Sequence, residues 1–93
     1  MDKYLIEVPH GDDKASCMRA IQVFLRSGSH FVTNAEWGCM DGDHKAWLTV
    51  ETETKDDAMR ILPAAYRRNA KIVKLVKFKR EDFELQDLMD HHA

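Results

Sequence analysis

Cysteine is scarce in this sequence: the 93 residues include only two, Cys17 and Cys39. Two cysteines cannot build the disulfide framework on which many small secreted domains depend. Long apolar runs are missing too, and no stretch approaches the ~18 consecutive apolar residues of a transmembrane helix. The opening segment, MDKYLIEVPHGDD, turns acidic by Asp12 and lacks the continuous apolar region of a signal peptide. These absences predict a cytoplasmic protein with no membrane partner.

Charge of one sign is not in excess either. Sixteen acidic and 14 basic residues give a formal net charge of −2. A chain with this balance offers nucleic acid no general electrostatic attraction. Basic residues crowd the last third of the chain, where they are typical of a solvated strand face and helix end. We therefore predict no nucleic-acid partner.

A hairpin is the clearest structural signal. Asp41-Gly42-Asp43 separates two alternating runs, and such a turn is typical of a β-hairpin. We expect its strands at about residues 30–40 and 45–52, with further strands at Lys3–Val8 and Lys71–Phe78. A two-residue loop would place Cys39 opposite Ala46 and Trp37 opposite Leu48, with all four side chains facing the helices.

Two segments carry helical patterns instead. Asp12 or Asp13 can cap the first helix, whose apolar residues recur at three- and four-residue spacing. This stripe consists of Cys17, Met18, Ile21, Phe24 and Leu25. The second helix begins at Thr54-Lys55-Asp56-Asp57, a capping box with Asp in place of Glu, and is interrupted at Pro63.

The resulting order, βαββαβ, predicts an α+β fold of the ferredoxin-like type. Residues 1–80 would form one domain, a four-stranded antiparallel sheet of order 4-1-3-2 with two helices on one face. Residues 81–93 would form a C-terminal helical tail. The expected core consists of Tyr4, Ile6, Ile21, Phe24, Trp37, Leu48, Val50 and Leu62.

The element order, Trp37-Gly38, the hairpin Asp41–Trp47 and the end of the third strand at Val50-Glu51 carry a resemblance. In these features the chain resembles small stand-alone ferredoxin-like domains, many of which belong to the dimeric α/β-barrel group or to uncharacterised families. One such uncharacterised family includes a nickel-binding member. The resemblance covers residues 3–78 and implies a homodimer, or a higher oligomer built from dimers.

The sheet face away from the helices is expected to be apolar, because it would carry Leu5, Val32, Met40, Trp47 and side chains of the fourth strand. A contiguous exposed apolar patch usually marks an interface. We expect a second copy of the chain to cover it, with the tail folding back over it as the alternative. Polar side chains on the same face would line a small-molecule site beside Trp47. The candidate ligand-binding residues are Glu7, His30, Asn34, Glu36, Trp47 and Glu51.

Metal binding is another possibility, without an organic cofactor. The potential ligands are His10, His30, Cys39, Asp41, Asp43, His44, His91 and His92, but none has a diagnostic spacing. Cys17 and Cys39 are expected to face the core, where thiols are usually inert. The best candidates are therefore His30 and then His44, and nickel or zinc suits such an imidazole–carboxylate site.

Known catalytic sequence motifs are missing: there is no GxSxG, no phosphate-binding glycine loop and no HExxH. We therefore favour a non-catalytic small-ligand-binding domain. The enzyme alternative is a cofactor-free isomerase or oxygenase of the dimeric α/β-barrel type. In that alternative Glu36 or Glu51 would act as the base and His30 would polarise the substrate.

Overall fold

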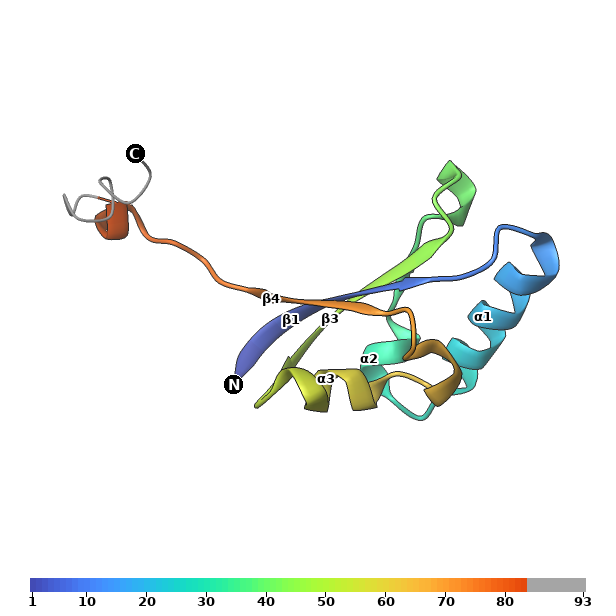
Figure 1. Cartoon of the computed structure of the whole chain (residues 1–93), viewed down its shortest axis with the longest axis horizontal. Helices are drawn as coiled ribbons and strands as arrows, with labels where there is room; N and C mark the ends of the chain where they lie inside the picture. Colours follow the sequence, from blue (N-terminus) through green and yellow to red (C-terminus); the bar gives the residue numbers. More distant parts are fainter. Residues whose placement is uncertain (84–93) are drawn as a thin grey trace.

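The computed structural model describes residues 1–83, which form an α+β domain with three α-helices and one four-stranded antiparallel sheet (Figure 1). The strands are β1 (Asp2–Pro9), β2 (Glu36–Trp37), β3 (Lys45–Thr52) and β4 (Lys71–Leu75). The helices are α1 (Lys14–Arg26), α2 (His30–Thr33) and α3 (Lys55–Ile61). Short 3-10 turns cover Cys39–Asp41, Ala64–Tyr66 and Arg80–Phe83.

The sheet has the order β2-β3-β1-β4, so β1 lies between β3 and β4. Counted from the β4 edge, the same sheet reads 4-1-3-2. The three helices lie on one side of it (Figure 1). The coarse α+β prediction is therefore confirmed, and β1 occupies the centre of the sheet.

The core lies between the sheet and the helices. Alternate residues of β1 are buried because successive side chains of a strand point to opposite faces. Six of the eight predicted core residues are buried: Tyr4, Ile6, Phe24, Leu48, Val50 and Leu62. The other two, Ile21 and Trp37, are half-buried. The predicted stripe of α1 was only partly correct, since Met18 and Leu25 are exposed and Ala20 is buried.

The second strand is much shorter than the predicted 30–40 range. The Ser29 side chain caps α2 by accepting a hydrogen bond from the backbone N–H of Val32 at 3.5 Å. The side chains of Thr33 and Asn34 donate to the carbonyl of His30 at 3.1 and 2.8 Å. Such local bonds compete with strand pairing, and a helix forms where the strand was expected. Val32 consequently lies in the core instead of on the open face of the sheet.

The hairpin register also differs from the prediction. Trp37 pairs with Ala46 instead of Leu48, because the connection is longer than two residues. The shift is by two positions, so Trp37 keeps its core-facing side of the sheet. Cys39 begins the 3-10 turn instead of pairing with Ala46, and Met40 is fully exposed on that turn.

Two glycines shape this hairpin connection. Gly42 has a φ of 83°, in the left-handed region that glycine adopts without strain. Gly38 accepts backbone hydrogen bonds from Asp41 and Asp43, each at 3.0 Å. A Cβ atom at Gly38 would lie 2.6 Å from the Asp43 carbonyl oxygen and 2.7 Å from the Trp47 ring. Only glycine therefore allows the turn to close over Trp47 in this way.

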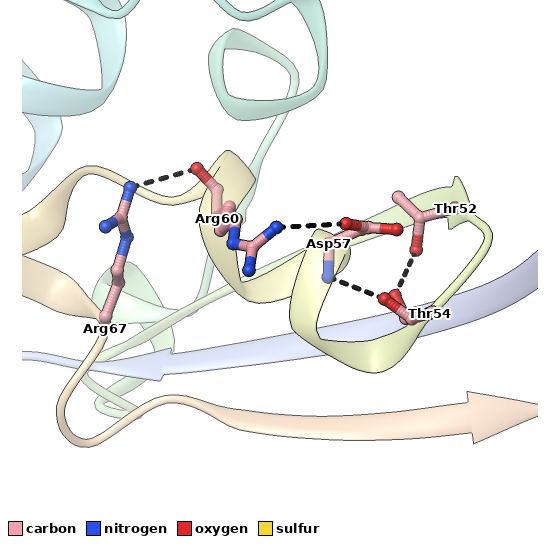
Figure 2. A network of polar contacts seen from close by, with 5 residues as sticks. All are labelled: Thr52, Thr54, Asp57, Arg60 and Arg67. Carbon is pink, nitrogen blue, oxygen red and sulfur yellow. Dashed lines mark hydrogen bonds and ion pairs between the residues drawn. The ribbon is translucent and has the colours of Figure 1, made fainter.

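Helix α3 is fixed at both ends by side chains (Figure 2). At its start, the Thr54 hydroxyl accepts from the backbone N–H of Asp57 at 3.1 Å, as the capping box predicted. At its end, Arg67 donates to the carbonyl oxygens of Arg60 and Leu62, at 3.0 and 2.9 Å. These carbonyls belong to the last turn, where backbone groups lack helical partners. The helix stops before Pro63, also as expected.

Strand β4 ends at Leu75, three residues before the predicted end, and the chain then leads away from the helices (Figure 1). Of the predicted helical tail, 81–93, the structure describes Glu81, Asp82 and Phe83, which belong to a 3-10 turn. The rest of the tail lies outside the described residues. Within residues 1–83, no helix is long and apolar enough to span a membrane.

Candidate metal centre

Three potential metal ligands meet at one end of the sheet: His10, Cys39 and His44. One ligand atom of each lies within 4.8 Å of the other two. We call these residues the His-Cys-His triad. His10 directly follows β1 and His44 directly precedes β3, while Cys39 begins the 3-10 turn between β2 and β3. Two histidines and a cysteine are ligand types that zinc and related ions prefer.

The β1–β3 ladder places the two histidines beside each other. Its last strand pair is Pro9 with Lys45. The backbone N–H of His10 then donates to the carbonyl of His44 at 3.1 Å, which continues the same register by one residue. The two imidazole centroids are 5.8 Å apart in an edge-on arrangement. The histidine pair is therefore built into the sheet register.

The tautomer of His10 follows from its hydrogen bonds. Its Nδ1 lies 3.0 Å from the carbonyl oxygen of Gly11. A carbonyl can only accept, so in this contact Nδ1 carries the proton and donates it. In the neutral ring Nε2 is then left with its lone pair, and it lies 3.1 Å from the Sγ of Cys39. An imidazole that donates one nitrogen to a carbonyl and offers the other to an ion is typical of metal-binding histidines.

Aromatic side chains hold the His10 ring in place. The ring stacks on Trp37, with centroids 5.7 Å apart and planes at 29°. Trp37 in turn meets the buried Phe24 edge to face, with centroids 5.0 Å apart. The His10 imidazole is therefore supported from the core, which reduces the conformational cost of binding an ion.

Cys39 is half-buried and belongs to a short hydrogen-bonded chain of thiols. The Sγ of Cys17, on α1, donates to the Sγ of Cys39 at 3.2 Å. Burial raises the pKa of the Cys39 thiol above its ordinary value. Cys39 is therefore a thiol at neutral pH, and an ion binding to it must displace the proton.

His44 has an unsatisfied ring nitrogen. Its Nδ1 is buried and has no hydrogen-bond partner among residues 1–83. Leaving a buried polar group unpaired costs about 1–3 kcal/mol. An ion bound at Nδ1 would remove this cost, whereas an apolar neighbour would not.

The spacing of the triad is close to that of a coordinated ion. A tetrahedral zinc ion with bonds of about 2.0–2.3 Å separates neighbouring ligand atoms by roughly 3.3–3.8 Å. The 3.1 Å contact between His10 and Cys39 is slightly shorter than this range, and the 4.8 Å limit on the whole triad is longer. The three ligand atoms are therefore already near the separations that a single ion requires.

Of the preferred metal pair predicted from the sequence, His30 and His44, the structure brings only His44 into the triad. His44 belongs to the triad, whereas His30 lies on α2 and does not. Cys39 was expected to be an inert core thiol, but it lies half-buried beside His10. His10 was only one of several possible ligands in the sequence. His10 lies opposite His44 only because the β1–β3 register continues one residue beyond the pair of Pro9 with Lys45, and alternation within β1 does not give that register.

A separate cleft of about 250 Å³ contains four of the six predicted ligand-binding residues. It is lined by Leu5, His30, Phe31, Asn34, Glu36, Trp47, Leu48 and Thr49. Glu7 is not among these residues, and its carboxylate instead accepts from Trp47 Nε1 at 3.2 Å. Glu51 lines a different cleft, with Lys3 and Phe31. The structure therefore brings His30, Asn34, Glu36 and Trp47 together. His30 and Asn34 come from α2 and its C-terminal cap and Glu36 from the two-residue β2, where one long strand was predicted.

Comparison of the chain with protein-family models, with curated protein sequences and with solved structures found no match. The resemblance to ferredoxin-like families of the dimeric α/β-barrel group therefore stays a prediction. The geometry of the residues themselves is the basis for any functional proposal.

Proposed function

We propose that this chain is a transition-metal-binding domain, and that zinc is its preferred ion. The observation that supports this most strongly is the triad, whose three ligand atoms lie within 4.8 Å of one another. A thiolate with two imidazoles suits zinc, with nickel as the next candidate. Because three protein ligands leave one position of a four-coordinate ion, a water molecule would complete the shell.

The ion would join three segments that are far apart in sequence. His10 ends the first strand, Cys39 belongs to the hairpin turn, and His44 begins the third strand. Binding is therefore expected to stabilise the fold, because an ion that binds only the folded chain adds its binding free energy to folding. We place this activity in the cytoplasm, as the sequence suggested.

Zinc titration of the reduced, metal-free protein against a chromophoric chelator tests the proposal. We expect one ion per chain and a higher melting temperature in its presence. His10→Ala, Cys39→Ala and His44→Ala should each weaken zinc binding by about 100-fold or more, since each removes a direct ligand. His30→Ala is the matched control, because His30 is outside the triad, and it should bind zinc as the natural chain does.

Circular dichroism of each variant separates loss of a ligand from loss of the fold. If His10→Ala and His44→Ala are folded and bind zinc with unchanged affinity, the triad is not a metal site and the proposal is wrong.

A second proposal concerns the cleft beside Trp47, where four predicted ligand residues meet. A cleft of this kind, with one aromatic wall and a few polar groups, suits a small polar organic molecule. Exposed apolar side chains in the segment that follows β4, including Val76 and Phe78, support self-association of the chain. Native mass spectrometry of untagged protein should show a dimer or a bound organic mass. A ligand-free monomer at micromolar concentration would contradict both parts of this proposal.

A further inference from the structure

The two cysteines of the chain lie against each other beside the triad. The Sγ atoms of Cys17 and Cys39 are 3.2 Å apart, although the residues are 22 positions apart in sequence. Both thiols are free and half-buried. The chain contains no other cysteine, so each has one possible intramolecular partner.

We propose that Cys17 and Cys39 form a reversible disulfide, and that its formation prevents metal binding at the triad. A disulfide bond is about 2.05 Å long, so the two sulfur atoms need to approach by roughly 1 Å. The second half of this inference rests on the proposed zinc function, because Cys39 is the residue that both reactions require. A sulfur in a disulfide carries no thiolate charge, and the ion would be left with two imidazoles only.

The hydrogen bonds supply a path for the proton that must leave. Cys39 lies 3.1 Å from the His10 Nε2, whose lone pair is free because Nδ1 donates to Gly11. His10 can therefore accept the Cys39 proton and generate the thiolate, which is the nucleophile in thiol–disulfide exchange. The Cys17 thiol already points its proton at Cys39 and is placed to attack the same sulfur next.

The oxidant we propose is a low-molecular-weight disulfide such as oxidised glutathione. The Cys39 thiolate attacks one of its sulfur atoms, which forms a mixed disulfide and releases one glutathione thiolate. Cys17 then loses its proton and attacks the Cys39 sulfur, which forms the Cys17–Cys39 bond and releases the second glutathione. Two protein thiols are oxidised, one glutathione disulfide is reduced to two thiols, and the two protons pass to the products.

The test uses the full chain in buffers of graded ratios of reduced to oxidised glutathione. After acid quenching and alkylation under denaturing conditions, intact mass spectrometry counts the free thiols. We expect the oxidised protein to have the mass of a single chain without a covalent cross-link to another, to lack two hydrogen atoms and to take up no alkyl group. Dithiothreitol should restore two alkylation sites. Cys17→Ser is the matched control and should stop at a single glutathione adduct on Cys39.

Zinc affinity of the same samples tests the link to the metal site. The oxidised chain should bind zinc at least 100-fold more weakly than the reduced chain, with recovery after dithiothreitol. Stable glutathione adducts on both cysteines, or cross-linked dimers in place of the internal bond, would overturn the disulfide. Formation of the disulfide with unchanged zinc affinity would overturn the link.

If the proposed zinc function is wrong, the outcome differs from the outcomes that would overturn the disulfide or its link to the metal site. The reduced chain would then bind no zinc, while the mass spectra would still show the internal disulfide. The link to the metal site would be lost in that case, and the thiol pair would stand alone.

Discussion

Phe24→Ala should lower the free energy of unfolding by about 3–5 kcal/mol, the range for removing a buried aromatic side chain. Phe24 is 1% exposed and meets two other rings edge to face, Trp37 at 5.0 Å and Tyr66 at 5.5 Å. A domain of this size has a total stability of roughly 5–14 kcal/mol, so the loss is a large share of it. Urea denaturation followed by circular dichroism measures the change.

Leu25→Ala provides the matched control for this prediction. Leu25 is the next residue of α1 but is 61% exposed, and its loss should change stability by less than about 0.5 kcal/mol. If Phe24→Ala cost no more than Leu25→Ala, the described core would be wrong. Because Trp37 links Phe24 to His10, the Phe24 variant is also expected to bind zinc more weakly.

Zinc affinity should fall by at least about 100-fold between pH 8 and pH 6. Burial beside Cys17 raises the pKa of the Cys39 thiol, so Cys39 is protonated over this whole range in the absence of metal. The ion binds the thiolate, and one proton must leave for each ion bound. Each unit of falling pH therefore weakens binding about tenfold through Cys39 alone.

Competition titrations at pH 8, 7 and 6 measure this slope. Calorimetry in two buffers of different ionisation enthalpy counts the protons released directly. His30→Ala should give the same slope as the natural chain, since His30 lies outside the triad. A zinc affinity that does not change with pH would mean that no thiol is among the ligands.

The sequence was most informative where one periodic pattern covers a whole element. β1 alternates along its full length, and the Thr54 cap of α3 is a local signal that needs no knowledge of the rest of the chain. The predicted second strand failed because several local bonds around Ser29 and Asn34 outweigh its weak alternation. Such bonds depend on side-chain geometry that hydrophobic periodicity does not describe.

The triad could not be predicted from the sequence spacing of its three residues, for a different reason. His10 and His44 become neighbours only through the register of β1 with β3, and Cys39 joins them through a turn whose form depends on Gly38. The predicted direction of Cys39 assumed that it belonged to a strand, where side chains alternate between faces. Inside a 3-10 turn that alternation does not apply, and the thiol lies beside His10 instead.

The central position of β1 has a consequence for the order of folding. The first strand of the chain takes its two neighbours from the middle and from the last third of the sequence. Pairings between distant segments are slow to form, because a long loop must close before any contact stabilises it. The triad exists only when the ladder between β1 and β3 has the native register, and it does not depend on β4. An ion bound there would therefore stabilise the native register of β1 with β3 over slipped registers, independently of the pairing of β4.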